Sequence, residues 1–389
     1  MPVKNRFAEL LPEISAWRQD FHAHPELRFD LPRTTGKVVE LLRSFGVDEV
    51  VEGVGQSGVV AVIKGRTDTA GRVIGFRADM DALPIVEATG LPHASTTAGK
   101  MHACGHDGHT SILLGAAKYL AETRQFDGTV VLAFQPAEEG GGGARAMVDA
   151  GLMDRWGIQE IYGLHNMPGI PAGEFAIKEG PMLAAADFFE ITVTGKGGHG
   201  AQPHVSVDST LAGAAIVMAL QQVVSRNVPP LQPAVLSVTG FASETMAHNV
   251  IPASAKLTGT VRTFHVPTKE LIRDRIKAVA EATAAAYGAT AELVYSDGVL
   301  PTVNAPTETG YAVAAAEAVA GRVKTDVEPS MGGEDFAEML AARPGAFILL
   351  GNGASADLHH PKYEFSDEAI PAGCSWFVTL AEQRMPLSA

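Results

Sequence analysis

The 389-residue sequence has little cysteine and no long apolar run, and each absence excludes a class of protein. Cysteine occurs only at Cys104 and Cys374, too few for a disulfide framework, so we expect a reducing, cytoplasmic location. No stretch of about 20 apolar residues could span a bilayer. The first ten residues, MPVKNRFAEL, lack the apolar run of a signal peptide.

Lysine and arginine are fewer than aspartate and glutamate. The chain has 30 lysines and arginines against 44 aspartates and glutamates, a net charge of −14, and no basic tract. Proteins that bind phosphate backbones or anionic membranes present a basic face, so neither nucleic acid nor a membrane is an expected partner. Histidine, with 13 residues, is abundant by comparison and raises the question of a metal site.

In the first half of the chain, short apolar runs alternate with helical patterns. Such alternation predicts an α/β domain with a mostly parallel sheet that is buried on both faces. The expected strands are Val59–Ile63, Val73–Phe76, Val130–Phe134 and Ile161–Leu164, and the expected helices are Thr34–Phe45, Thr110–Arg124 and Ala144–Ala150.

The pattern changes after about residue 184. From Phe188 to Tyr295 the order is strand, helix, strand, strand, helix, strand, which resembles a ferredoxin-like α+β unit. The α/β pattern returns near residue 300. We therefore expect one α/β domain, residues 1–183 and 299–389, interrupted by an inserted α+β domain, residues 184–298.

The densest group of candidate ligands is MHACGHDGH, residues 101–109. It precedes the helix expected at Thr110 and is therefore predicted to lie on a loop, where open α/β sheets bind ligands. Cys104 and His106 flank one glycine, so in an extended segment both side chains would point to the same face. Thiol, imidazole and carboxylate together suit zinc, manganese or cobalt. The alternative is a histidine-rich loop with one buried thiol.

Three other expected strands end in similar residues. Glu138 and Glu139 follow one strand, His165 ends the next, and Asp79 and Asp81 follow a third. Adjacent acids face opposite ways, so one could bind a metal while the other acts as a general base. Paired surface glutamates are the alternative. Because carboxyl ends of parallel strands meet at one edge, the four groups together predict a metal site, with Asp79 or Asp81 orienting a ligand.

A glycine run, residues 140–143, follows the glutamates and could in principle cradle a phosphate. The run lacks the G-x-x-x-x-G-K-[ST] pattern, and no dinucleotide fingerprint accompanies it. A nucleotide site is therefore not favoured.

Six motifs in order resemble the amidohydrolase branch of the dinuclear metallopeptidase family, which includes carboxypeptidase G-type enzymes and aminoacylases. That branch contains hippurate hydrolases, N-acyl-amino-acid deacylases and plant hydrolases of indole-acetyl amino acids. The motifs are Arg77–Pro84, Met101–His109, Gln135–Gly140, Gly197–Ala201, Gly332–Phe336 and Leu358–Pro361.

The resemblance implies a hydrolase of N-acyl amino acids that uses two divalent metal ions, with Mn, Zn, Co and Ni as candidates. It implies Glu138 as the catalytic base and Asp81 as the acid that orients the metal site. The implied ligands are Cys104 as the bridging ligand, His106, Glu139, His165 and His359, with the neighbouring His360 as the alternative to His359.

The resemblance also implies that the inserted domain is a dimerising lid, so that the protein forms a homodimer or homotetramer. His199 would reach an active site across the dimer, and Asn249 and Arg262 would grip the substrate carboxylate. Alternatives stay open: His199 could be a turn residue and Arg262 an ordinary ion-pair partner. A dipeptidase, an aminopeptidase or a non-catalytic metal-binding module are the competing functions.

Overall fold

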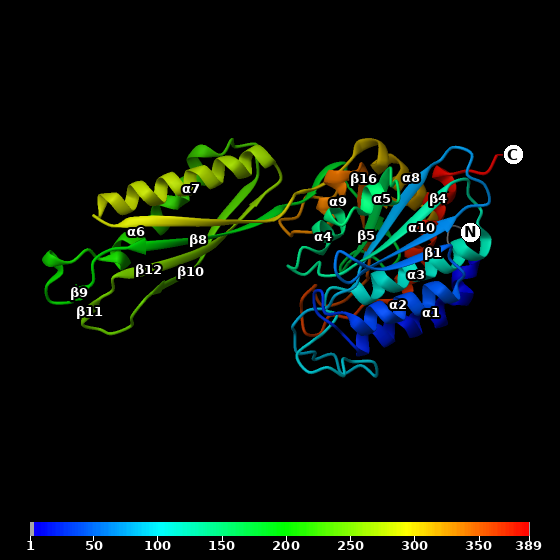
Figure 1. Cartoon of the computed structure of the whole chain (residues 1–389), viewed down its shortest axis with the longest axis horizontal. Helices are drawn as coiled ribbons and strands as arrows, with labels where there is room; N and C mark the ends of the chain where they lie inside the picture. Colours follow the sequence, from blue (N-terminus) through cyan, green and yellow to red (C-terminus); the bar gives the residue numbers. More distant parts are fainter. Residues whose placement is uncertain (1–3, 389) are drawn as a thin grey trace. The chain divides into compact units, whose positions relative to one another are not determined.

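The computed structural model describes residues 4–388, which divide into two compact units (Figure 1). Unit 1 comprises residues 4–182, 303–328 and 335–388, and unit 2 comprises residues 183–302 and 329–334. The sequence had placed residues 299–302 and 329–334 in the first domain; both segments pack with unit 2. No helix among the described residues is long and apolar enough to cross a membrane.

Unit 1 is built on an eight-stranded sheet with the order β1-β2-β4-β3-β5-β16-β6-β15. At its centre β4, β3, β5 and β16 run parallel, and β3, β4 and β5 are almost wholly buried. The predicted α/β class is therefore confirmed. One difference concerns the strand predicted at Val59–Ile63: as β2, it runs antiparallel to β4. The strands are β1 (Glu49–Val54), β2 (Gly58–Lys64), β3 (Val73–Asp79), β4 (Thr129–Gln135), β5 (Glu160–Met167), β6 (Phe175–Ala176), β15 (Val323–Lys324) and β16 (Gly345–Gly351).

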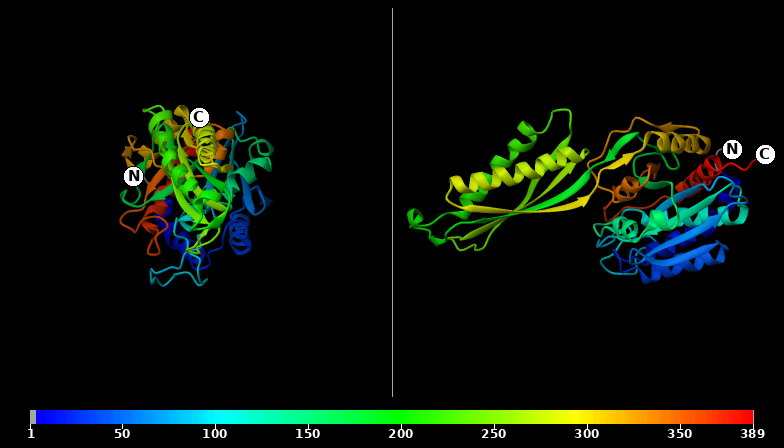
Figure 2. Two further views of the ribbon diagram at one scale, coloured as in Figure 1. Left: turned by 90° about the vertical axis from the view of Figure 1, so that its left-hand side faces the viewer. Right: turned by 45° about the horizontal axis from the view of Figure 1, so that its top comes forward.

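Helices cover this sheet and bury its apolar side chains. α1 packs against α3 and α10, and α8 packs against α10, with Phe7, Ile14 and Trp376 in the shared core. Figure 2 shows α1 and α2, in blue, beside the cyan helix α3. The helices are α1 (Asn5–Ala23), α2 (Pro32–Ser44), α3 (His106–Thr123), α4 (Gly143–Asp149), α5 (Leu152–Arg155), α8 (Pro306–Ala320), α9 (Phe336–Ala342) and α10 (Ile370–Arg384).

Unit 2 has the predicted order of strands and helices. Its antiparallel sheet has the order β10-β12-β8-β13, and α6 and α7 pack on it around an apolar core that includes Phe189, Leu257 and Ile276. Asp208 starts α6 because its side chain accepts hydrogen bonds from the backbone N–H groups of Thr210 and Leu211. The elements are β8 (Ala185–Thr194), α6 (Ser209–Gln222), β10 (Ala234–Ser243), β12 (Ser254–Thr263), α7 (Val266–Ala286) and β13 (Thr290–Val299).

Two small ladders and three short helical turns, η1 (Pro203–Val205), η2 (Val223–Asn227) and η3 (Asp367–Ala369), complete the described elements. β9 (Gly198–His199) pairs with β11 (Val250–Ile251) in unit 2, beyond the end of the sheet at which β8 finishes and β12 begins (Figure 1). β7 (Gly180–Leu183) pairs with β14 (Thr302–Asn304) where the chain passes between the units.

Candidate metal centre

The parallel strands of unit 1 deliver polar side chains to one edge of the sheet. β3 ends at Asp79, which pairs with Gln135 at the end of β4. Arg77 pairs with Gly163 of β5, so His165 lies in the same row as Asp79. The residues that follow these strands are therefore brought together by register, as the sequence predicted for parallel strands.

The cluster around Cys104 differs from the expected extended loop. Gly105 adopts a left-handed conformation (φ 86°) and α3 begins at His106, four residues earlier than predicted. His106 and His109 thus lie in the first turn of a buried helix. Donor atoms of Cys104 and His106 still belong to one group, although the two residues flank a left-handed glycine and do not alternate along a strand.

Four groups of donor atoms among the described residues contain Cys104 or His106, and within each group the atoms lie within 4.8 Å of one another; one is Asp79–His106–His109, and the other three include the predicted ligands. Cys104 belongs to two of them, and its Sγ lies 3.4 Å from Nε2 of His165. Oε1 of Glu139 lies 3.2 Å from Nε2 of His359. The other three groups are Cys104–His106–His165, Cys104–Glu139–His359 and His106–Glu138–Glu139.

The described residues place His359, and not His360, in such a group. His359 has φ 64°, an unfavourable conformation for a residue with a side chain, so surrounding contacts must hold it there. The ring of His360 instead accepts a hydrogen bond from the backbone N–H of Lys362. Of the two histidines, the one that the resemblance implies, His359, therefore has its donor atoms near those of Cys104 and Glu139.

These donors fit a divalent cation. Both ring nitrogens of the buried His106 lack a hydrogen-bond partner among the described residues, which is costly for a polar group without another ligand. Burial opposes a charge on His106, yet Asp79 and Asp81 raise its pKa well above the usual range, so the site attracts positive charge. Burial raises the pKa of the Cys104 thiol, and a bound cation is what would favour its thiolate.

His165 and His109 are held by a second layer of hydrogen bonds. Nδ1 of His165 donates to the carbonyl oxygen of Asn166 (2.6 Å), which leaves Nε2 facing Cys104. Nδ1 of His109 donates to Asp79 (2.7 Å), and its Nε2 accepts from the backbone N–H of Asn166 (2.9 Å). Burial lowers the pKa of His165, which favours the neutral form that binds metals.

Asp81 holds the two adjacent glutamates. Its buried carboxylate accepts hydrogen bonds from the backbone N–H groups of Glu138 (2.9 Å) and Glu139 (3.1 Å). Oδ1 of Asp81 also lies 3.7 Å from Nδ1 of His106. One carboxylate therefore links the glutamates to a candidate ligand.

The three remaining predicted residues, His199, Asn249 and Arg262, lie in unit 2, and Arg262 lies far from the other two. His199 is exposed on β9, and the backbone N–H of Gly200 donates to the carbonyl of Asn249, so these residues are neighbours. Arg262 lies eight residues beyond Ser254, the first residue of β12. At about 3.3 Å per residue that is roughly 26 Å along the strand. Within one chain, Asn249 and Arg262 therefore cannot grip the same carboxylate.

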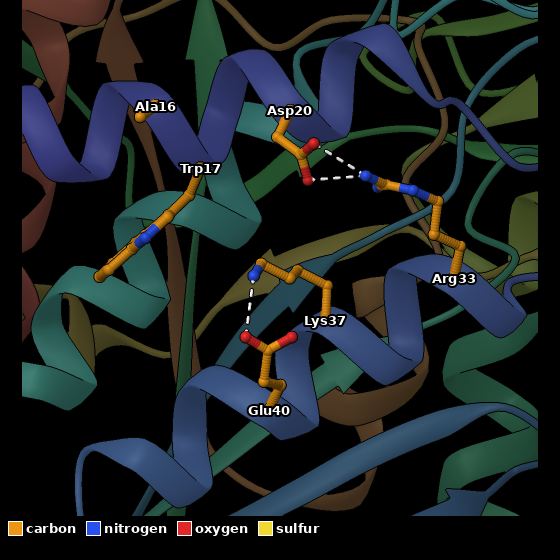
Figure 3. A pocket seen from close by; sticks show the side chains of 6 residues that line it. All are labelled: Ala16, Trp17, Asp20, Arg33, Lys37 and Glu40. Carbon is orange, nitrogen blue, oxygen red and sulfur yellow. Dashed lines mark hydrogen bonds and ion pairs between the residues drawn. The ribbon is translucent and has the colours of Figure 1, made fainter.

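A separate cavity of about 530 Å³ lies between α1 and α2 (Figure 3). Its charged groups neutralise one another: Arg33 pairs with Asp20 at 2.8 Å and Lys37 pairs with Glu40 at 3.0 Å. Ala16 and Trp17 form the rest of the cavity wall, and none of the predicted site residues is among the lining residues. The cavity is thus distinct from the metal centre.

Several buried charged residues lie around the centre, and the sequence alone does not predict their contacts. Arg77 and Asp335 were noticed only as members of motifs, and the structure joins them in one network. His22 was given no role, although its ring contacts Asp107 behind the cluster. For Arg77 a signal existed: a charged residue inside the apolar strand Val73–Asp79.

Comparisons with known proteins show the family of the chain. Residues 75–383 match the sequence profile described as "Peptidase family M20/M25/M40". N-acetylcysteine deacetylase of Bacillus subtilis is 42% identical over 367 residues, 94% of each chain. Hippurate hydrolase of Campylobacter jejuni is 38% identical over 376 residues, 96% of this chain and 97% of the relative. The solved structure of Bacillus subtilis YXEP, described as a dinuclear metal binding peptidase, superposes with a TM-score of 0.86 at 37% identity, covering 97% of this chain and 99% of that chain.

The buried pair of His22 and Asp107 predicts a pH-dependent stability. Burial alone would lower the pKa of His22, but Asp107 (2.9 Å) and Glu87 (3.4 Å) raise it to about 9. A raised folded-state pKa means that the protonated ring stabilises the fold below the unfolded value of 6.5, and that this contribution is lost as the pH rises through 9. We expect the free energy of unfolding of metal-free protein, measured in urea, to fall between pH 6.5 and 9.

Two variants separate this contribution from other titrations. In His22→Gln, the fall of the unfolding free energy between pH 6.5 and 9 should be smaller. His24→Gln changes a half-exposed histidine two residues further along the chain and should keep the full fall. An identical slope in His22→Gln and in the unsubstituted protein would contradict the assignment.

Proposed function

The chain belongs to peptidase family M20/M25/M40, and from this we propose that it is a metal-dependent amidohydrolase that cleaves N-acyl amino acids to a carboxylic acid and a free amino acid. The observation that carries the proposal is the convergence of thiol, imidazole and carboxylate donors around Cys104, with Glu138 beside them. The relatives named N-acetylcysteine deacetylase and hippurate hydrolase support the substrate class.

The proposed ligands provide for two cations, with Cys104 shared between them. Bound divalent cations would polarise the amide carbonyl and lower the pKa of water at the site. Mixed sulfur, nitrogen and oxygen donors suit zinc, manganese, cobalt or nickel. The ligands are Cys104, His106, Glu139, His165 and His359.

Glu138 is the proposed base. Its carboxylate is half-buried and lies within 4.8 Å of donor atoms of His106 and Glu139, so it can reach a water molecule at the centre. Glu138 accepts a proton from the attacking water and delivers it to the leaving amine. Asp81 supports the base Glu138 and the ligand Glu139, because its carboxylate accepts hydrogen bonds from the backbone N–H groups of both.

Unit 2 is the proposed lid and dimerisation domain. Arg262 would bind the substrate carboxylate, since a planar guanidinium donates to two oxygens at once. His199 would donate to the developing oxyanion. Because His199 and Asn249 lie at the opposite end of unit 2 from Arg262, we assign this pair to the site of a second chain, in a homodimer or a homotetramer. A cytoplasmic location stays a prediction.

A substrate panel tests the proposal. Hippurate and N-acetyl amino acids should be hydrolysed, free-amine dipeptides should be poor substrates, and chelation should abolish activity. Glu138→Gln should lower kcat by about 10²- to 10⁴-fold while the metal content, measured by mass spectrometry, stays unchanged.

The exposed Glu368→Gln serves as the matched control and should behave as the unsubstituted enzyme. Activity that survives chelation, or an active Glu138→Gln, would contradict the proposed function. Turnover of dipeptides alone would replace the substrate class with that of a dipeptidase.

A mixed dimer tests whether His199 acts across chains. Glu138→Gln and His199→Ala are each expected to be nearly inactive. A heterodimer of the two, purified through separate affinity tags, contains one site with both native residues, so it should recover about half of the native activity. A heterodimer as inactive as its parents would show that His199 acts within its own chain, and a fully active His199→Ala parent would show that His199 has no catalytic role.

A further inference from the structure

The segment that carries Glu138 and Glu139, residues 136–142 between β4 and α4, is here named the glutamate loop. Three residues of the loop have a positive φ: Ala137 with 54°, and Gly140 and Gly142 with 72° each. A non-glycine residue in the left-handed region is unfavourable and persists only where contacts enforce it. Backbone hydrogen bonds within the loop support this conformation, and contacts from outside the loop add to them.

Asp335 contacts both ends of this loop. Oδ1 of Asp335 accepts a hydrogen bond from Nε2 of Gln135 (2.6 Å), the last residue of β4. Oδ2 accepts from the backbone N–H of Ala144 (3.0 Å), in the first turn of α4. One carboxylate, 1% exposed, thus ties the start of the glutamate loop to its end. The motif Gly332–Phe336, which contains Asp335, had received no role.

Arg77 balances the charge of Asp335. The guanidinium is fully buried and lies 3.3 Å from Oδ1 of Asp335 through Nη2. Its Nε donates to Oε1 of Gln135 (2.8 Å), and its Nη1 donates to Asp79 (2.8 Å). A buried carboxylate without such a partner would be strongly unfavourable. Arg77, Gln135 and Asp335 therefore form one connected polar network.

The network continues to the candidate ligands. Asp79 accepts the hydrogen bond of His109 through one oxygen, and the other oxygen lies 3.7 Å from Nε2 of His106. The network therefore borders the candidate metal centre at two places, at the glutamate loop and at the start of α3. Outer carboxylates of this kind commonly tune metal affinity and activity.

We propose that Asp335 is a positioning residue that fixes Glu138 and Glu139 by clamping both ends of the glutamate loop, with Arg77 as its counter-ion. This role rests on the proposed function for its effect on turnover. Its effect on the geometry of bound metal does not depend on any particular substrate, because Glu139 is itself a proposed ligand.

Asp335→Asn tests the clamp in the full-length protein loaded with Co²⁺. The amide replaces one oxygen acceptor with an N–H donor, so either the pair formed by Gln135 and Arg77 or the N–H of Ala144 loses its partner. We expect kcat to fall roughly 10- to 100-fold while KM changes little, and the visible absorption of bound Co²⁺ to change in position or intensity.

Glu338→Gln is the matched control. It removes an ion pair with Arg145 (2.8 Å) that also joins α9 to α4 but touches neither end of the glutamate loop. This variant should keep the native kcat and the native Co²⁺ spectrum. A general loosening of the contact between α4 and α9 would affect it as well and would argue against the clamp.

A folded Asp335→Asn with native kcat and native spectrum would overturn the proposal. If that variant does not fold, Gln135→Met decides. It removes the anchor at the start of the loop, together with the acceptor of the Arg77 Nε hydrogen bond, and keeps the bond from Asp335 to Ala144. A native kcat and spectrum there would likewise overturn the proposal. An unsubstituted enzyme that cleaves none of the N-acyl amino acids would contradict the proposed function, and the Co²⁺ spectra would still decide the role of Asp335.

Discussion

The candidate site depends on the parallel pairing of β3 with β4 and β5. The register places Asp79, Gln135 and His165 in one row across the sheet. A shift of one residue would turn these side chains to opposite faces, because successive residues of a strand alternate. The apolar residues of the three strands hold this register, since both faces of the sheet are covered. The chemistry of the site is therefore secured by packing that is remote from it.

The buried charges around this row explain why a cation fits. Asp79 and Asp81 lie close to His106, and Arg77 forms ion pairs with Asp79 and Asp335. Buried anions of this density are unfavourable unless cations compensate them. Buried carboxylates that would destabilise the metal-free protein can thus bind metal ions or orient their ligands, and such clusters of charge are typical of functional sites.

The sequence predicted much of this arrangement, because apolar periodicity reports directly on buried strands and helices. It predicted the α/β class and the order of elements in unit 2. It misplaced the start of α3, since the helix begins with polar residues and depends on the left-handed Gly105, which periodicity cannot detect. It also missed the association of residues 329–334 with unit 2, because that segment has no periodic pattern.

Long-range side-chain contacts were the least predictable feature. Asp335 and Gln135 are 200 residues apart in the chain, and only the fold shows that they share a hydrogen bond. Similarly, no spacing rule indicates the left-handed conformation of His359, φ 64°, or that its donor atoms lie near those of Cys104 and Glu139. Motifs identified the residue types of the site, whereas their partners required three-dimensional coordinates.

Metal stoichiometry measures whether one thiol, Cys104, serves two metal ions as proposed. Purified protein dialysed against Mn²⁺ or Co²⁺ should retain two ions per chain. Cys104→Ala should lose tight binding of both, while Cys374→Ala, which changes a buried cysteine that belongs to none of the donor groups, should still bind two. Two ions retained by Cys104→Ala, or none bound by the unsubstituted protein, would contradict the account.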